Sequence, residues 1–159
     1  MISRRALFTL LAGDVRARRW MLAVAVAIPV VASVVFLAGV DRVLGFELLY
    51  VALIAAALGG WTRAGLAAGA ATVGAAVLWR FVFPPLVGYL RDSMNTRYVP
   101  PRFLDYKANP RAELVEGLTN GPPAAVAAAV VLGGAAYGVG VGLRRVLRKS
   151  AAERSPDGF

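Results

Sequence analysis

Two charged residues, Glu47 and Arg80, each lie near one end of a long apolar stretch of the sequence. Between these stretches, residues 59–63 (Gly-Gly-Trp-Thr-Arg) predict a tight turn that joins two helices. Glu47 precedes Trp61, and Arg80 follows Ala64, by similar numbers of residues, which at 1.5 Å per helical residue places the two charges roughly 21 and 24 Å above the turn. The sequence therefore predicts that Glu47 and Arg80 lie at similar heights on adjacent helices, where they could form an ion pair.

Two interpretations of this pair remain open. In the structural interpretation the pair fastens the two helices together, or both side chains extend to the membrane surface, because a lone charge beside hydrocarbon is costly. In the functional interpretation Glu47 binds a proton or cation on a transport path. We favour the structural interpretation, since both residues lie near the predicted boundary of the membrane and not at its midplane.

Other common reactive groups are missing from the sequence. It contains neither cysteine nor histidine, which excludes disulfides, thiolate metal sites and the usual general base near neutral pH. Its nine acidic residues show no paired spacing. We therefore expect no catalytic activity, no metal site and no cofactor.

The composition predicts an all-α, polytopic membrane protein. Hydrophobic residues make up 58% of the chain and the mean hydropathy is +0.64. These residues are concentrated in blocks of about twenty, the length that a helix needs to cross roughly 30 Å of hydrocarbon. We expect four transmembrane helices, at residues 20–40, 44–60, 64–83 and 122–143, with the second and third forming a hairpin.

One sizeable loop is expected between the third and fourth spans, over residues 84–121. Pro84 and the proline after it are predicted to end the third helix. These 38 residues are too few to build a core of their own, so the loop should lie across the membrane surface. Within it, Asn109 followed by a proline predicts the start of a short helix, with the asparagine as its cap.

The charge distribution predicts the orientation. The net charge is +9, but the basic residues flank apolar blocks, which indicates the lipid bilayer and not nucleic acid as the partner. The N-terminal segment 1–19, which could form an interfacial helix, the turn at Arg63 and the tail 144–159 together carry eleven basic residues, against seven on the opposite side. The positive-inside rule then places both termini in the cytoplasm of a cell-membrane protein.

Glycines recur at a helix-packing spacing in the third and fourth spans. Gly134, Gly138 and Gly142 form a tandem of the GxxxG spacing that lets helix backbones approach closely, and Gly65 and Gly69 share that spacing. These glycines could pack the third span against the fourth, or the fourth span could form a dimer. We favour packing within the chain, because the Ala-, Gly- and Arg-rich composition of a GC-rich genome produces such spacings often.

Taken together, these features favour a non-catalytic subunit or accessory factor of a membrane complex. Its partners would be the lipid bilayer and other membrane subunits, or further copies of itself. The alternative is a small oligomeric transporter or channel that uses Glu47. A membrane-embedded enzyme fits least well, because no cluster of carboxylates or of Ser with Lys lies at one depth.

Overall fold

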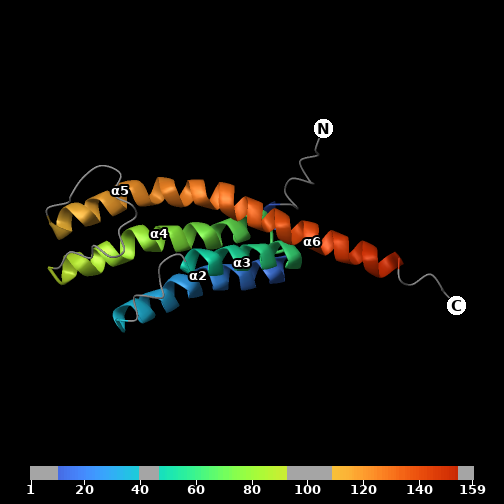
Figure 1. Ribbon diagram of the computed structural model, residues 1–159, viewed down its shortest axis with the longest axis horizontal. Helices are drawn as coiled ribbons and strands as arrows, with labels where there is room; N and C mark the ends of the chain where they lie inside the picture. The colour runs from blue at the N-terminus through green and yellow to red at the C-terminus, as the bar shows by residue number, and fades with distance from the viewer. Residues whose placement is uncertain (1–10, 40–46, 93–108, 154–159) are drawn as a thin grey trace.

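The computed structural model describes residues 11–39, 47–92 and 109–153, and its regular secondary structure is entirely helical (Figure 1). These residues form four helices, which confirms the all-α prediction. They are α2 (Val15–Leu37), α3 (Glu47–Thr62), α4 (Leu66–Leu90) and one long helix that consists of α5 (Pro110–Ala128), a π-helical turn η2 (Ala129–Gly133) and α6 (Gly134–Glu153).

Three of these helices are long and apolar enough to cross a membrane. They are α2, α4 and the stretch Pro110–Ala151 of the long helix, which spans 42 residues or roughly 63 Å. The fourth, α3, has 16 residues and is therefore only about 24 Å long. A helix is present where the span 44–60 was expected, as α3 from Glu47 onward, but its length does not confirm a fourth span; residues 44–46 lie outside the described part.

The distribution of side chains suits a lipid environment. The core consists largely of alanine, with Ala52 and Ala56 fully buried. Branched apolar side chains point outward instead, as Val26 on α2 and Ile54 on α3 do at 64% and 63% exposure. In water this arrangement would expose most of the hydrophobic surface, whereas in a bilayer small residues let helices approach and large ones contact lipid.

The third helix continues past its expected end. The prediction that Pro84 and Pro85 stop the helix is wrong, because α4 runs on to Leu90 with both prolines inside it. The two prolines leave the carbonyl groups of Arg80 and Phe81 without their usual intrahelical donors. Packing against α5 holds this part of α4 in place: the backbone of Gly117 lies directly against the Phe81 carbonyl.

The fourth helix is also longer than expected at both ends. Asn109 caps it as predicted, since its side chain accepts a 2.8 Å hydrogen bond from the N–H of Ala112. The helix does not end within the predicted loop, however, but continues through Pro122 and Pro123. The expected loop 84–121 is therefore wrong at both ends, and residues 93–108 lie outside the described part.

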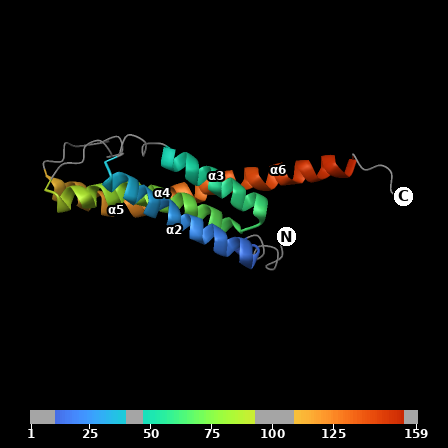
Figure 2. The same cartoon turned by 90° about the horizontal axis from the view of Figure 1, so that it is seen from below.

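The predicted cytoplasmic segments are also partly helical. The first span was expected at 20–40, but α2 begins at Val15 and ends at Leu37, so three arginines of the expected segment 1–19 belong to this helix. At the other end α6 carries the chain beyond the expected tail boundary, as far as Glu153. Figure 2 shows α6 extending past the ends of the other helices.

The predicted hairpin between α3 and α4 is confirmed, and its turn has a defined geometry. The N–H of Ala64 donates to the carbonyl of Gly59 at 2.9 Å, and the N–H of Arg63 donates to that of Gly60 at 3.5 Å. This is the hydrogen-bond pattern of a Schellman motif, in which the residue after the helix adopts the left-handed conformation. Here that residue is Arg63, with a φ of 64°.

The long helix changes partners at the π turn. Before the turn it runs along α4, where Ala125 lies against Gly74. At the turn Gly133 approaches Ala70, so that a Cβ on Gly133 would lie 2.8 Å from the Cα of Ala70. Beyond it the helix crosses α3, where Gly140 lies directly against the carbonyl of Ala57.

The π turn explains how both contacts fall on one side of the helix. Ala125 and Gly133 are eight residues apart, which in an uninterrupted α-helix would rotate the second about 80° away from the first. A π turn accommodates one extra residue in the helix and so cancels this rotation. Both residues are consequently buried against α4.

Candidate functional site at the basic end of the bundle

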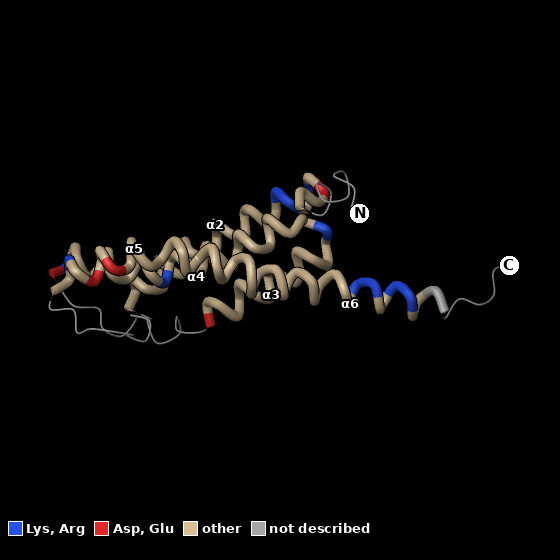
Figure 3. The backbone as a smooth tube through the Cα atoms, turned by 90° about the horizontal axis from the view of Figure 1, so that it is seen from above, with Lys and Arg blue, Asp and Glu red and all other residues tan. Residues whose placement is uncertain are grey.

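Most of the basic residues gather at one end of the bundle. This end, which we call the basic end, is where α2 begins, α3 ends and α6 emerges from the bundle (Figure 3). It carries eight of the eleven Lys and Arg residues in the described part: Arg16, Arg18, Arg19, Arg63, Arg144, Arg145, Arg148 and Lys149. Cationic side chains are thus concentrated where the three helices meet.

A compact junction fixes the geometry of the basic end. The carboxylate of Asp14 caps α2 by accepting 3.0 Å hydrogen bonds from the N–H groups of Arg16 and Ala17. The backbone of Asp14 contacts the α3–α4 turn. Gly13 precedes Asp14 and Gly65 belongs to the turn, and their φ values are 61° and 93°. A Cβ on Gly65 would lie 2.6 Å from the carbonyl oxygen of Leu11. Gly65 therefore serves this junction and does not pack α4 against α6.

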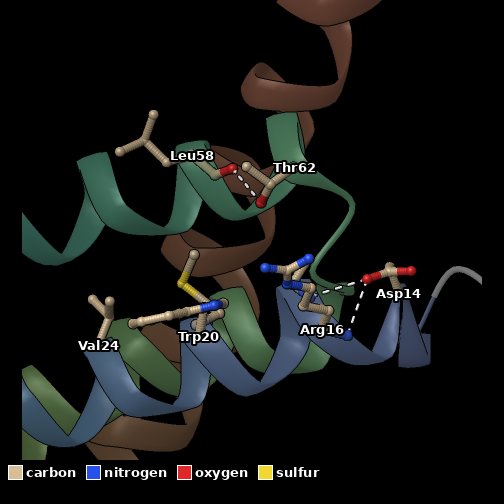
Figure 4. A pocket seen from close by; sticks show the side chains of 8 residues that line it. Asp14, Arg16, Trp20, Val24, Leu58 and Thr62 are labelled. Carbon is tan, nitrogen blue, oxygen red and sulfur yellow. Dashed lines mark hydrogen bonds between the residues drawn. The ribbon is translucent and has the colours of Figure 1, made fainter.

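Two grooves open on either side of Thr62. The first, the α2–α3 groove, has a volume of about 390 Å³ and lies between the start of α2 and the end of α3 (Figure 4). Arg16 and Trp20 project into it from α2, opposite Leu58 and Thr62. The Thr62 hydroxyl donates a 2.9 Å hydrogen bond to the Leu58 carbonyl, and the Asp14 carboxylate caps α2, so both polar groups have backbone partners.

The second groove, the α3–α6 groove, lies between the end of α3 and the emerging part of α6 and has a volume of about 540 Å³. Its lining residues are Trp61, Thr62, Arg144, Leu147, Arg148 and Ala151. None of these side chains is acidic. The groove is therefore positively charged, with an aromatic ring from α3 and an aliphatic side chain from α6 among its lining residues.

The arginines of this groove interact electrostatically. Partial desolvation lowers the pKa of Arg144, which follows the last apolar residue of the expected fourth span, below its ordinary value. The positive charges of Arg148 and Arg63 lower the pKa of Arg144 further. Arg144 and Arg148 thus line a groove beside Thr62 with a further positive charge at the next residue, Arg63, and this arrangement favours binding of an anion.

The predicted pair of Glu47 and Arg80 does not form. Within the described residues the structure shows no ion pair between them. Glu47 is exposed in the first turn of α3, where it opens onto an apolar groove of about 360 Å³ between α2 and α3. Arg80 is half-buried on α4. Similar height on adjacent helices does not by itself bring two side chains together, because contact also depends on the rotation of each helix about its axis.

The five glycines of the sequence analysis serve different purposes. Gly69 does pack α4 against α6, since a Cβ there would lie 3.2 Å from the Tyr137 ring. By contrast, a Cβ on Gly134, Gly138 or Gly142 would meet no other atom of the described chain within 4 Å. The expectation that these three glycines pack within the chain is therefore wrong, and they form an open row on α6.

Two polar features of the interior were missed by the sequence analysis. The indole N–H of Trp79 donates a 2.8 Å hydrogen bond to the Ser33 hydroxyl, which in turn donates to the carbonyl of Pro29 at 2.7 Å. Glu113 is only 3% exposed and lies on the same face of α5 as Gly117 and Gly121. The spacing of four between these residues was the available signal for that buried face.

Comparison with known protein families, characterised proteins and solved structures finds no match for this chain. In the described residues no group of three or more acidic side chains could hold a metal ion. The geometry of the helices and the charges at the basic end are therefore the features of the molecule that bear on function.

Proposed function

We propose that the chain is a non-catalytic subunit or accessory factor of a membrane complex, and that it packs against another membrane helix through the open face of α6. The observation that carries this proposal is the row of Gly134, Gly138 and Gly142, whose missing side chains leave open space. Glycine inside a helix costs about 1 kcal/mol relative to alanine. Contact with lipid does not require glycine, whereas close approach of another helix does.

Other residues of the same helix support this distinction. Gly133 and Gly140 are buried in contacts with α4 and α3, so packing within the chain already accounts for them. The outward residues on the lipid-facing side are large, such as Val130 and Val139 at 69% and 66% exposure. A row of glycines on an outer surface that also carries large valines is the pattern expected of a helix–helix contact.

The test replaces one glycine of the open row by a large residue. Gly138→Leu should leave the fold of the single chain intact, because its side chain extends into open space. It should separate the chain from its partner or from a second copy. The measurement is the molar mass, determined by light scattering, of the complex isolated from its native membrane in mild detergent. Val139→Leu, at the neighbouring exposed position, should change nothing. Equal masses for both variants and the parent protein would rule out this face as the contact.

The topology proposed with this function has four spans, with α3 as the shortest, and the basic end in the cytoplasm. The concentration of cations at that end supports this orientation. The chain lacks cysteine, so single cysteines can be introduced without background. An impermeant thiol reagent applied to intact cells should label a cysteine at Asn95 but not one at Ser150, and the reverse pattern would invert the topology.

A small oligomeric transporter or channel is the second candidate, and the apolar groove beside Glu47 favours it. A carboxylate at the opening of an apolar groove could bind a proton or cation if another copy closed the groove. In liposomes, loss of ion or proton flux on Glu47→Gln with the fold retained would favour transport over the subunit role. Unchanged flux would exclude Glu47 as the transport residue.

A further inference from the structure

We propose that the α3–α6 groove binds the phosphate headgroup of an anionic phospholipid through Arg144 and Arg148, with Arg63 at its rim. This site is independent of the open glycine row, which lies on α6 but not in the groove. Three observations support it: the charge of the groove, its position beside an interfacial tryptophan, and the apolar surface that leads away from it.

The charge of the groove favours an anion. Arg144 and Arg148 project from successive turns of α6, and Arg63 contributes a third positive charge from the end of α3. No acidic side chain is among the residues that line the groove. Like charges held close together repel, and a phosphate group relieves this repulsion while accepting paired hydrogen bonds from guanidinium groups.

The conformation of Arg63 indicates that its side chain has a role. It occupies the left-handed position of the Schellman motif, with a φ of 64°, where glycine is the usual residue. An arginine there is less favourable for the backbone than glycine. Arg63 nevertheless directly follows Thr62, a lining residue of the groove, and so adds a third positive charge beside it.

The surroundings of the groove favour a lipid over free phosphate. Trp61, at one side, has the amphipathic character of residues that settle at headgroup level. Along α6, exposed Leu147, Leu143 and Val139 form an apolar track that leads from the groove back toward the membrane-spanning part of the helix. A phosphate between the arginines would thus continue into acyl chains on this track, as it does in basic headgroup pockets beside membrane helices.

The test compares two double variants of the full chain in mild detergent. Native mass spectrometry would measure binding of phosphatidylglycerol and of phosphatidylcholine with the same acyl chains. Arg144→Gln with Arg148→Gln removes two charges from the groove, and Arg145→Gln with Lys149→Gln removes two charges from the same helix outside it. The parent protein should bind phosphatidylglycerol at least about fivefold more tightly than phosphatidylcholine.

The groove variant should lose that preference, whereas the control variant should retain it within about twofold. Equal losses in both variants would indicate diffuse attraction to basic residues and would overturn the site, as would no loss in either. Inorganic phosphate at millimolar concentration should not displace the lipid; displacement would overturn the assignment to a lipid. If the groove variant fails to fold, the single variants Arg148→Gln and Arg145→Gln provide the same comparison.

Discussion

The backbone N–H of Asp14 donates a 2.8 Å hydrogen bond to the carbonyl oxygen of Arg63. Asp14 thereby performs two tasks, since its carboxylate caps α2 while its N–H holds the residue that ends α3. The bond joins two parts of the chain that are almost fifty residues apart in sequence. It also fixes the backbone of Arg63 in a conformation that arginine alone would disfavour.

Arg63→Gly should separate stability from lipid binding. Glycine adopts a φ of 64° without steric cost, so the free energy of unfolding should stay constant or rise by up to about 1 kcal/mol. Binding of phosphatidylglycerol should fall at the same time, because the third guanidinium is gone. Helical circular dichroism during titration with SDS would measure the first effect, and native mass spectrometry the second. A clear loss of stability would show that the Arg63 side chain has a structural role instead.

Gly140→Ala and Gly142→Ala should have opposite effects although they are two residues apart on one helix. A Cβ at Gly140 would collide with the Ala57 carbonyl and force α3 away from α6, at a cost of about 3 kcal/mol. A Cβ at Gly142 meets open space, so the better helix former alanine should stabilise the chain by up to about 1 kcal/mol. SDS-induced unfolding would give both values. Similar losses in the two variants would contradict the assignment of the inner and outer faces of α6.

Ser33→Ala should destabilise the interface of α2 with α4 by about 1 kcal/mol, because it deprives the Trp79 indole N–H of its acceptor. Trp79→Phe should cost more. It also disturbs the stacking on Phe83, at 5.5 Å between ring centroids, and the edge contact with Phe36. The double variant should lose less than the sum of the single losses, since both remove one hydrogen bond. Strict additivity would mean that this bond contributes nothing to stability in the membrane.

The effects of Glu47→Gln and Arg80→Gln on the free energy of unfolding should add. Glu47 opens onto the groove between α2 and α3, and no ion pair with Arg80 is present in the described residues. Variants without a shared contact usually combine within about 0.5 kcal/mol. The check is a double-mutant cycle in detergent. If the double variant loses clearly less stability than the sum of the two single losses, Glu47 and Arg80 interact, as the sequence indicated.

Local signals in the sequence predicted local structure well. The all-α class, the hairpin at Arg63 and the cap at Asn109 all follow from residue types within one or two turns of a helix. The positions at which the third helix ends and the fourth begins could not be predicted in this way, because both helices run through their prolines. Proline rules describe a helix without neighbours, whereas α4 and α5 support each other through the close approach at Gly117 and Gly121.

The candidate sites required information that spacing does not contain. The glycine spacing identified possible rows on the fourth span but not the row that faces inward, because the π turn shifts the rotational phase of the helix. The α3–α6 groove combines Trp61 and Thr62 with arginines about eighty residues further along the chain, and only the crossing of α3 by α6 brings them together. The direction of Glu47 likewise depends on the rotation of α3 about its axis.

The π turn makes the two halves of the long helix separately adjustable. If the five residues of η2 (Ala129–Gly133) formed an ordinary α-helical segment instead, α6 would turn by about 80° relative to α5. Gly140 would then leave its place against Ala57, and the arginines of α6 would no longer face Trp61. The π turn thus determines which glycines of α6 are buried, which are exposed, and which arginines line the α3–α6 groove, while the contacts of α5 with α4 stay as they are.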